Sequence, residues 1–435
     1  MKKIAFHTLG CKVNAYETEA MIQLLQKAGY TIVPFQEKAD IYIINTCSVT
    51  NMADRKSRQI LHRAKKTNPQ AIVVAAGCYV QTATQKVLDD LSIDIVVGNN
   101  RKKDIVAILE TYEKDRDAQK RDANVIDINH TDEYEDLEIS TVTEHTRAHL
   151  KIQDGCNHFC SYCIIPYARG RIRSRKIENI KNELIRLSKA GFKEVVFTGI
   201  NLGCYLDGEN KLIDVLEMAG EIEGIERIRI SSLDPEVITP EFTQRLAKIN
   251  KICPHFHLSM QSGCDKTLKA MNRHYTSEEF LEKCNLLRKY FDNPAFTTDV
   301  IVGFPGETNE EHIASMEFVK KVAFAELHVF KYSKRDGTVA AKMENQVPEN
   351  IKSIRSEEMI EVGKILTKQY REGRLGKKSS VLFEEKTSIA EKEYWVGHTP
   401  DYIKVALEND DIVSGEIRQV TLTDFINQEI MLATE

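Results

Sequence analysis

The 435-residue sequence contains a single tryptophan, ten prolines and no long apolar run. A membrane-spanning helix needs about 18 or more consecutive apolar residues, so we expect no association with a membrane. The first residues include two lysines but only a short apolar stretch, which does not fit a secretion signal. These absences predict a cytoplasmic protein.

Net charge is also small, at −5, so composition gives no global indication of nucleic-acid binding. Positive charge is concentrated in two segments. Residues 54–66 carry six basic side chains and one acidic one, and residues 147–176 carry seven and one. Each segment is either a solvated basic face or a surface for an anionic partner.

The hydrophobic pattern predicts an α/β fold that begins with a doubly wound sheet. In residues 1–112, short and continuously apolar runs alternate with helical segments, as in a parallel sheet covered on both faces. Residues 113–144 carry eleven acidic side chains and four basic ones. We interpret them as an exposed acidic connector, with one strand at residues 123–128.

Two further domains are predicted after the connector. Residues 145–373 contain six strand–helix repeats, which predicts a partial (βα)6 barrel rather than a complete eight-stranded one. The segment 344–374 is helical and charged. Residues 374–435 show short strands without helices between them, which predicts a small all-β barrel.

Ten cysteines in a cytoplasmic chain favour metal ligands or reactive thiols over disulfides. Cys156, Cys160 and Cys163 form a CxxxCxxC set directly after the strand expected at residues 148–153. That position is the ligand-binding end of a parallel α/β sheet. Three thiolates can hold three irons of a 4Fe–4S cluster and leave the fourth iron open. The alternatives are a zinc knuckle, with His158 as a strained fourth ligand, or incidental cysteines.

An open iron can bind the amine and carboxylate of S-adenosylmethionine (SAM), and an electron can then cleave SAM to give a carbon radical. The CxxxCxxC set, placed on the first of several βα repeats, resembles the radical SAM superfamily. The resemblance implies that Tyr162 lies near the SAM adenine. It also implies that Thr198 and Gly199, which end the second barrel strand, contact SAM.

Three other cysteines occupy equivalent positions in the first domain. Cys11, Cys47 and Cys78 each come just after an apolar strand. The carboxyl ends of parallel strands meet at one edge of a sheet, so these thiols should converge there. They predict a second iron–sulfur site with an open iron, and the alternative is three reduced, partly buried cysteines. Two such sites suggest that one domain supplies sulfur and the other a radical.

At this point the sequence resembles the methylthiotransferase family over nearly its whole length. The segments that carry the resemblance are HTLGCKVNAYETEA, NTCSVT, AAGCYVQ, IQDGCNHFCSYCIIPYARGRIRSR, TGINLGCY, SMQSGC and TDVIVGFPGET. Within the family, TLGCKVN and YETEA are most similar to the branch that acts on N6-threonylcarbamoyladenosine of tRNA. The branches for isopentenyladenosine and for a ribosomal protein usually read GCQMN and GCPKN.

The resemblance implies a methylthiotransferase domain, a radical SAM domain and a TRAM-like RNA-binding domain. It implies SAM and two 4Fe–4S clusters, one on Cys11, Cys47 and Cys78 and one on Cys156, Cys160 and Cys163. The implied activity is insertion of a 2-methylthio group into the modified adenosine 37 beside the tRNA anticodon. The implied partners are the tRNA anticodon stem-loop, an electron donor such as flavodoxin or ferredoxin, and a sulfur source that the sequence does not identify.

Some residues have two interpretations. Thr198, Gly199, Ser259, Gln261 and Asp299 lie at or near strand ends, where each either faces the SAM cavity or packs and caps its strand. Arginines alternate through the segment after the CxxxCxxC set, which predicts one basic face for phosphate contact; they are Arg169, Arg171, Arg173 and Arg175. The remaining thiols lack cluster spacing and are interpreted as ordinary buried cysteines; they are Cys204, Cys253, Cys264 and Cys284.

The tail departs from the expected pattern, because residues 374–435 carry seven basic and twelve acidic side chains. An RNA-binding domain is normally basic. RNA contact would then use either the basic segments of the first two domains or a small local face; that face comprises Lys377, Lys378, Lys404, Tyr394, Trp395 and Tyr402. The alternatives are methylthiolation of a ribosomal protein or of isopentenyladenosine, or a zinc-stabilised RNA-binding protein without enzymatic activity.

Overall fold

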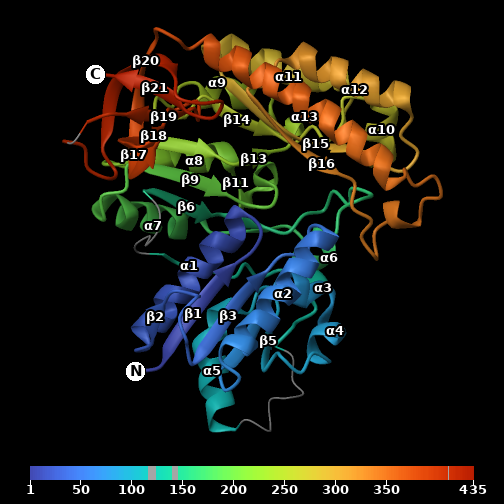
Figure 1. Ribbon diagram of the computed structural model, residues 1–435, viewed down its shortest axis with the longest axis vertical. Helices are drawn as coiled ribbons and strands as arrows, with labels where there is room; N and C mark the ends of the chain where they lie inside the picture. The colour runs from blue at the N-terminus through green and yellow to red at the C-terminus, as the bar shows by residue number, and fades with distance from the viewer. Residues whose placement is uncertain (116–123, 140–145, 410) are drawn as a thin grey trace.

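The computed structural model describes residues 1–115, 124–139, 146–409 and 411–435. Figure 1 shows an N-terminal α/β layer at the bottom, a partial barrel above it, and a small all-β barrel at the upper left. No helix in these ranges is both long and apolar enough to cross a membrane. The fold is therefore the three-part α/β architecture that the sequence predicts.

Five parallel strands form the N-terminal sheet in the order β2-β1-β3-β4-β5. They are β1 (Lys3–Thr8), β2 (Thr31–Val33), β3 (Ile41–Thr46), β4 (Ile72–Gly77) and β5 (Ile95–Val97). Helices α1 (Lys12–Lys27) and α5 (Ile105–Lys114) cover one face, and α2 (Asn51–Thr67) covers the other. The short helices that follow β4 are α3 (Cys78–Thr82) and α4 (Thr84–Leu88). Coverage on both faces explains why β3 and β4 are buried throughout, and why β4 and the first four residues of β3 are apolar.

Six parallel strands form the partial barrel. They are β6 (Arg147–Lys151), β9 (Glu194–Thr198), β12 (Arg227–Ile230), β14 (His255–Leu258), β15 (Ala295–Val302) and β16 (Glu326–Lys331). The covering helices are α7 (Ile177–Lys189), α8 (Leu212–Gly220), α9 (Pro240–Leu246), α11 (Ser277–Tyr290) and α12 (Asn309–Val322). Strand β12 pairs with β9, and its extension β13 (Ser232–Leu233) pairs with β14, so one run of chain joins the two halves. Helix α13 (Glu349–Glu372) then crosses to the last domain.

The last domain is a closed five-stranded barrel in the order β17-β18-β19-β21-β20. Its strands are β17 (Lys378–Ile389), β18 (Lys392–His398), β19 (Lys404–Leu407), β20 (Ile417–Phe425) and β21 (Met431–Thr434). It packs on the amino-terminal ends of the central strands: Arg227 donates to the His398 carbonyl at 3.0 Å, and Arg229 donates to the Pro400 carbonyl at 2.8 Å. The small barrel thus closes the end of the central barrel opposite the carboxyl ends of its strands.

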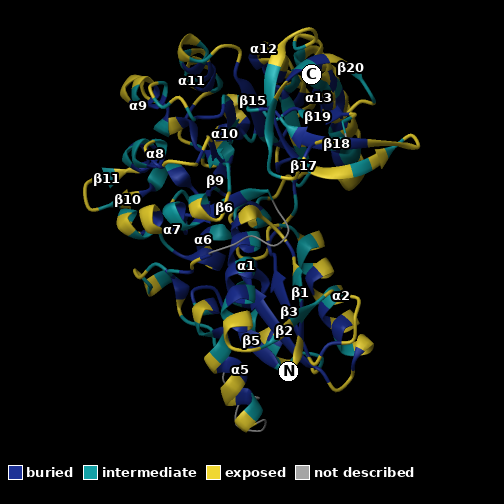
Figure 2. Ribbon diagram, turned by 90° about the vertical axis from the view of Figure 1, so that its left-hand side faces the viewer, coloured by how far each residue is buried: buried dark blue, intermediate teal, exposed yellow. Residues whose placement is uncertain are grey.

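Side chains on the central strands alternate between two environments. Leu150 of β6 and Ile228 of β12 pack outward into the main core against the helices. Arg147, Lys151 and Arg229 lie on the opposite face of the same strands, which is the inner face. Figure 2 shows this layering, with buried strands and helices whose outer sides are exposed. The outer face of the barrel, which the helices cover, is therefore apolar, and its inner face is polar.

The connector differs from its predicted form. Leu137 and Ile139 are buried against Tyr16 of α1 and against α7, so the described part is not an exposed tether. Instead of a strand at residues 123–128, Asn124 makes one isolated bridge to Val97. Residues 116–123 and 140–145 lie outside the described part of the chain. This segment packs against the protein although it is acidic, because burying its alternate apolar side chains stabilises the contact between the first two domains.

Candidate active site

Cys11, Cys47 and Cys78 lie together at the carboxyl edge of the N-terminal sheet. Cys11 precedes α1, Cys47 follows β3, and Cys78 begins α3 directly after β4. Burial, together with the neighbouring Cys78 and Cys11 thiols, raises the pKa of Cys47 to about 11. Burial also raises the pKa of Cys11. Burial thus holds the pKa of two of the grouped thiols, Cys11 and Cys47, above the usual value, and a positive centre beside them would favour their thiolate forms.

Two glycines let the backbone approach this group closely. Gly10 has φ +106°, and a Cβ atom there would lie 3.1 Å from the Cys47 Sγ. Gly77 has φ +95°, and a Cβ atom there would lie 2.5 Å from the Asn45 Oδ1. A side chain at either position would strain the turn, and at Gly10 it would also push into the space beside the Cys47 sulfur. Asn99 adds a polar contact, because its Nδ2 donates to the Cys78 Sγ at 3.6 Å.

The CxxxCxxC loop lies at the carboxyl end of the first barrel strand, after β7 (Gln153–Asp154) and before α6 (Ile165–Arg169). Burial and the neighbouring Cys160 raise the pKa of Cys163 to about 12, and burial raises that of Cys156. The backbone N–H of Ile165 donates to the Cys163 Sγ at 3.4 Å. Arg273 donates to the Cys160 Sγ at 3.4 Å. The loop therefore presents sulfur atoms with N–H groups already directed at them.

The spacing of the sulfur atoms distinguishes a cluster from a single ion. Among the described residues, neither cysteine trio brings all three Sγ atoms within 4.8 Å of one another. Four sulfurs around one tetrahedral zinc at about 2.3 Å would lie about 3.8 Å apart. Each trio is thus spread more widely than one zinc ion requires, and thiolate-only ligation suits an iron–sulfur cluster. His158 is not held as a fourth ligand, since its Nδ1 faces Asp234 at 3.5 Å and its Nε2 faces Asn201 at 3.3 Å.

The predicted SAM residues surround the same mouth of the barrel. Thr198 ends β9 with its Oγ1 buried and without a hydrogen-bond partner. A Cβ atom at Gly199 would lie 3.0 Å from Gln153 Oε1, so this glycine allows a close approach. Ser259 follows β14, and its carbonyl accepts from Arg273 at 3.0 Å. Tyr162 packs against a small apolar cluster next to the loop; its members include Met271, Phe304 and Tyr332.

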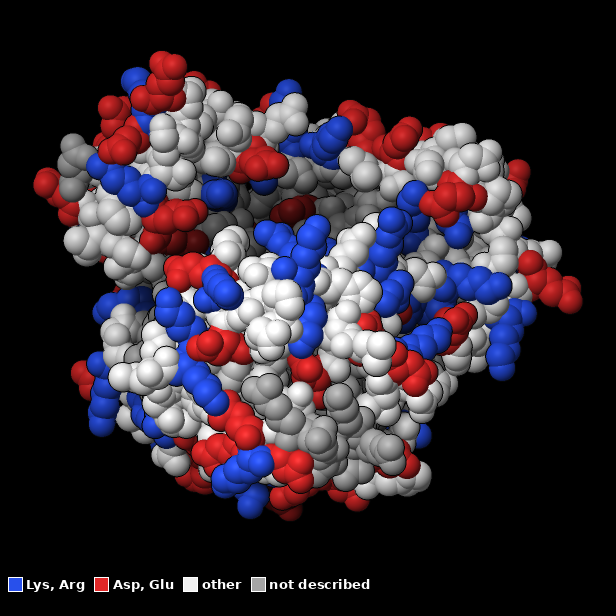
Figure 3. All heavy atoms as spheres, turned by 60° about the horizontal axis from the view of Figure 1, so that its bottom comes forward, with Lys and Arg blue, Asp and Glu red and all other residues white. Residues whose placement is uncertain are grey.

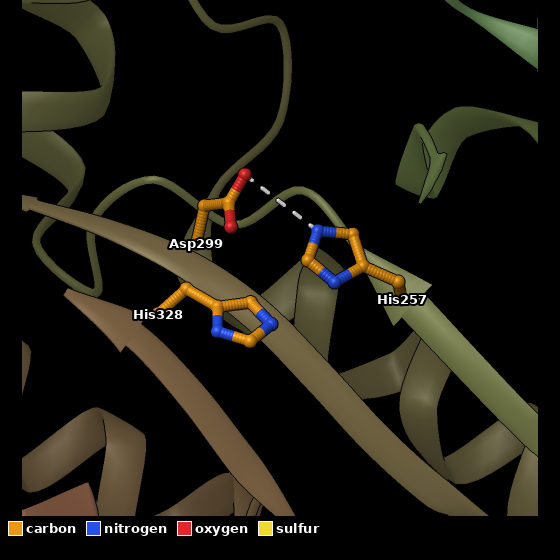
Figure 4. A group of neighbouring side chains, drawn as sticks. All are labelled: His257, Asp299 and His328. Atoms are coloured by element: carbon orange, nitrogen blue, oxygen red, sulfur yellow. Dashed lines mark ion pairs between the residues drawn. The ribbon is translucent and has the colours of Figure 1, made fainter. Parts of the chain in front are cut away.

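Gln261 and Asp299 lie further along the inner face. Gln261 has φ +68°, and its N–H donates to the Asp299 carbonyl at 2.9 Å. The Asp299 side chain faces His257, whose Nε2 is 3.6 Å from Oδ2. Figure 4 shows His257, Asp299 and His328 directed toward one another from three adjacent strands. This group is a polar wall of the barrel interior that sequence reasoning found only in part, through Asp299.

A buried ion network connects the two cysteine sites. Glu17 of α1 accepts from Arg169 and Lys151 of the barrel domain and from Lys102 of the N-terminal domain, at 2.7–2.8 Å. Arg169 also contacts Asp154 at 3.1 Å, immediately before the CxxxCxxC loop. Burial alone would raise the pKa of Glu17, but Arg169, Lys102 and Lys151 together hold it well below its usual value. The network fixes the two domains, and with them the two sites, relative to each other.

This network corrects the prediction for the alternating arginines. Arg169 and Arg175 are fully buried and Arg173 nearly so. Arg175 pairs with Glu183 at 2.6 Å, and Arg171 stacks over the Phe159 ring at 4.6 Å. The prediction of one basic face for phosphate contact is therefore wrong. The segment resembled an exposed basic strand because the acidic partners of its arginines, among them Glu17, Asp154 and Glu183, lie outside the segment itself.

The predicted local RNA face of the last domain is also wrong in part. Tyr402 stacks on His255 and His398, with ring centroids 5.0 and 4.7 Å apart. Arg147 and Arg229 lie over the same ring at 5.1 and 4.7 Å. Tyr402 is thus part of the floor of the central barrel rather than a free stacking platform. Tyr394 is buried within the small barrel.

Lys12, which sequence reasoning did not single out as a site residue, faces the space above this floor. Its side chain is solvent-accessible, yet burial and the charges of Arg229 and Arg147 lower its pKa to about 8. The preceding residue, Cys11, is also exposed. Figure 3 shows a hollow between the two halves of the molecule, with Lys and Arg side chains along its rim.

Comparison with known proteins agrees with this geometry. Residues 150–319 match the radical SAM superfamily, and residues 3–98 match the uncharacterized protein family UPF0004. A solved radical S-adenosylmethionine methyltransferase, TsrM from Kitasatospora setae, shares the fold with a TM-score of 0.57 at 15% identity. The match covers 76% of this chain and 75% of that one. The fold and the cysteine loop thus define a radical SAM enzyme.

Curated relatives narrow the class. The chain is 42% identical to the threonylcarbamoyladenosine tRNA methylthiotransferase MtaB of Bacillus subtilis, over 97% of this chain and 94% of that protein. It is 39% identical to the MtaB of Aquifex aeolicus, over 90% and 95%. A tRNA-2-methylthio-N(6)-dimethylallyladenosine synthase from Thermodesulfovibrio yellowstonii is 35% identical, over 97% and 96%. The chain belongs to the radical SAM tRNA methylthiotransferase family, whose cofactors are SAM and two 4Fe–4S clusters.

Proposed function

We propose that this enzyme inserts a methylthio group at C2 of N6-threonylcarbamoyladenosine 37, next to the anticodon of tRNA. The observation that carries the proposal is the pair of cysteine trios at two sheet edges, held together by the buried network around Glu17 and Arg169. The 42% identity to a threonylcarbamoyladenosine enzyme supports this substrate over the dimethylallyl one at 35%.

Each trio has its own cofactor in this proposal. Cys156, Cys160 and Cys163 hold the cluster that binds SAM, and Cys11, Cys47 and Cys78 hold the auxiliary cluster. When bound, these groups supply a carbon radical at the barrel mouth and sulfur at the sheet edge. The SAM contacts that we assign from the barrel mouth are Tyr162, Thr198, Gly199, Ser259, Gln261 and Asp299.

The polypeptide itself positions the two cysteine sites and shields the barrel interior from water. N–H groups of Arg273 and Asn99 donate to cysteine sulfurs, which stabilises the thiolate form at each site. Lys12 and Cys11 are exposed beside each other at the sheet edge. Tyr402 and its arginine partners close the far end of that interior, which keeps bulk water from the floor. The target base would enter from the open side, between the two trios.

Binding of the anticodon stem-loop is assigned mainly to α2. Its basic side chains are exposed and follow one another along the helix; they are Arg55, Lys56, Arg58, Arg63 and Lys66. These charges can neutralise phosphates on both sides of the anticodon.

We assign domain boundaries at residues 1–112, 113–144, 145–373 and 374–435. A flavodoxin or ferredoxin in the cytoplasm is the proposed electron donor. The sulfur comes from a separate donor that the sequence does not identify.

Nucleoside analysis tests the proposal. The anaerobically reconstituted holoenzyme is incubated with SAM, a reductant, and tRNA that carries either threonylcarbamoyladenosine or dimethylallyladenosine. Mass spectrometry of the digested tRNA should show the 2-methylthio product from the first substrate. Product only from the second substrate would contradict the assignment. Product in a ribosomal protein but in neither tRNA would also contradict it.

A further inference from the structure

The position of Lys12 links substrate recognition to the auxiliary site. Lys12 is the first residue of α1 and directly follows Cys11, so the two Cα atoms are about 3.8 Å apart. Its charge interacts with Arg229 of β12, with Arg147 of β6 and, with opposite sign, with Glu194 of β9. It also acts on His255 of β14. These residues lie on the inner face of the central strands. Lys12 therefore extends from the N-terminal sheet edge toward the interior of the barrel.

The cations around Lys12 already have anionic partners. Arg229 Nε donates to Glu194 Oε1 at 2.7 Å, and the Arg147 Nε lies 3.0 Å from Glu384 Oε1. Within the described ranges, Lys12 has no ion pair and no side-chain hydrogen bond. Its side chain is exposed. Such a group favours an anionic ligand, because a carboxylate there would complete the charge balance that the protein leaves open.

The chemistry of the substrate provides that anion. A threonylcarbamoyl group on N6 of adenine ends in a free carboxylate, whereas a dimethylallyl group is a hydrocarbon. Sulfur is inserted at C2 of the same small ring, so a residue that contacts the N6 substituent must lie close to the auxiliary cysteines. Lys12 meets this condition through its bond to Cys11.

We propose that Lys12 binds the carboxylate of the threonylcarbamoyl group, and that this contact selects the substrate over one with an apolar N6 group. The inference rests on the proposed function and adds a residue that recognises the threonylcarbamoyl group on N6. Lys12 acts here as a specificity-determining residue and not as a cluster ligand.

A chemical double-mutant cycle tests this assignment. The holoenzyme and its Lys12→Gln variant are assayed on a synthetic anticodon stem-loop that carries threonylcarbamoyladenosine or the methyl ester of its carboxylate. A charged hydrogen bond contributes about 1.5–3 kcal/mol, so either change alone should lower kcat/KM about 10- to 100-fold, chiefly through KM. The two changes together should cost little more than one. Lys12→Arg should restore most of the activity, and Lys27→Gln at the exposed end of α1 is the matched control.

The outcomes separate the two proposals. Additive losses from the variant and the ester, or an ester that the wild-type enzyme uses as well as the free acid, would overturn the role of Lys12. The ester arm leaves the protein unchanged, so it decides the question even when Lys12→Gln loses iron. Failure of the wild-type enzyme on the free acid would instead overturn the proposed function, and this inference with it.

Discussion

Arg169 of the barrel domain donates from Nη1 to Oε1 of Glu17 in the N-terminal domain at 2.8 Å, and both side chains are fully buried. Glu17 also accepts from Lys102 and Lys151. Arg169 lowers the pKa of Cys11 and Cys47, against the larger effect of burial, so this ion pair lies beside the auxiliary site. One pair of residues thus holds the relative position of the two sites.

Removal of the Glu17 charge should destabilise the protein strongly. Glu17→Gln leaves three buried cations without their shared anion, and breaking a buried ion pair in this way costs about 3–5 kcal/mol. Anaerobic denaturant unfolding measures the change. Glu110→Gln, at an exposed position of α5, should leave stability unchanged. Equal unfolding curves for the Glu17 variant and the wild type would contradict the structural role of the network.

The same network predicts a pH dependence. The folded-state pKa of Glu17 lies well below the unfolded-state value of 4.5. The unfolded chain therefore binds this proton first, so the stabilisation is fully present above pH 4.5 and is lost as the pH falls toward the folded-state value. The difference in Tm between wild type and Glu17→Gln should shrink as the pH is lowered from 5 to about 3. A difference that stays constant over this range would show that ionisation of Glu17 is not its source.

Gly77→Ala should damage the auxiliary site selectively. The added Cβ would lie 2.5 Å from Asn45 Oδ1 and 2.8 Å from the Thr46 carbonyl, at a backbone with φ +95°. We expect loss of about half of the iron, since one of two clusters is displaced. Gly29→Ala is matched in φ, at +90°, but has no atom within 4 Å of its Cβ, so it should retain its iron. Iron and sulfide analysis compares them, and equal loss in both variants would exclude the steric explanation.

Neutralising α2 should weaken tRNA binding in a salt-dependent way. In a variant with Arg55, Lys56 and Arg63 replaced by Gln, the slope of log K against log salt should fall by about 2–3, if each base contacts one phosphate. Lys364 and Lys368 on α13 are exposed bases for the control variant. Filter binding across a salt series measures both slopes. An unchanged slope in the α2 variant would show that the tRNA-binding surface lies elsewhere.

The sequence allowed most of the architecture to be predicted, together with the placement of Cys11, Cys47 and Cys78 at one sheet edge. Continuous apolar runs such as residues 72–77 mark buried parallel strands, and the cysteines that follow them are local signals. Asp299 was predicted from its strand, but its neighbours His257 and His328 come from separate strands that only the barrel brings together.

Long-range pairing limited the rest of the prediction. Glu17 and Arg169 are 152 residues apart, and no local pattern marks either as buried. The alternating arginines had the periodicity of an exposed strand because period-two spacing does not show which face is buried. Arg273 reaches Cys160 across 113 residues, again without a local signal. Cys11 is a strand-end residue like the others, but the role of Lys12 beside it depends on the barrel interior.

The most direct test of the central claim compares Cys160→Ala with Cys47→Ala in anaerobic, reconstituted enzyme. Both SAM cleavage and the methylthio nucleoside are quantified in one reaction with threonylcarbamoyladenosine tRNA. The account predicts that Cys160→Ala abolishes both products, whereas Cys47→Ala retains SAM cleavage and forms no methylthio nucleoside. Methylthio product from the Cys47 variant, or SAM cleavage by the Cys160 variant, would contradict the division of labour between the two sites.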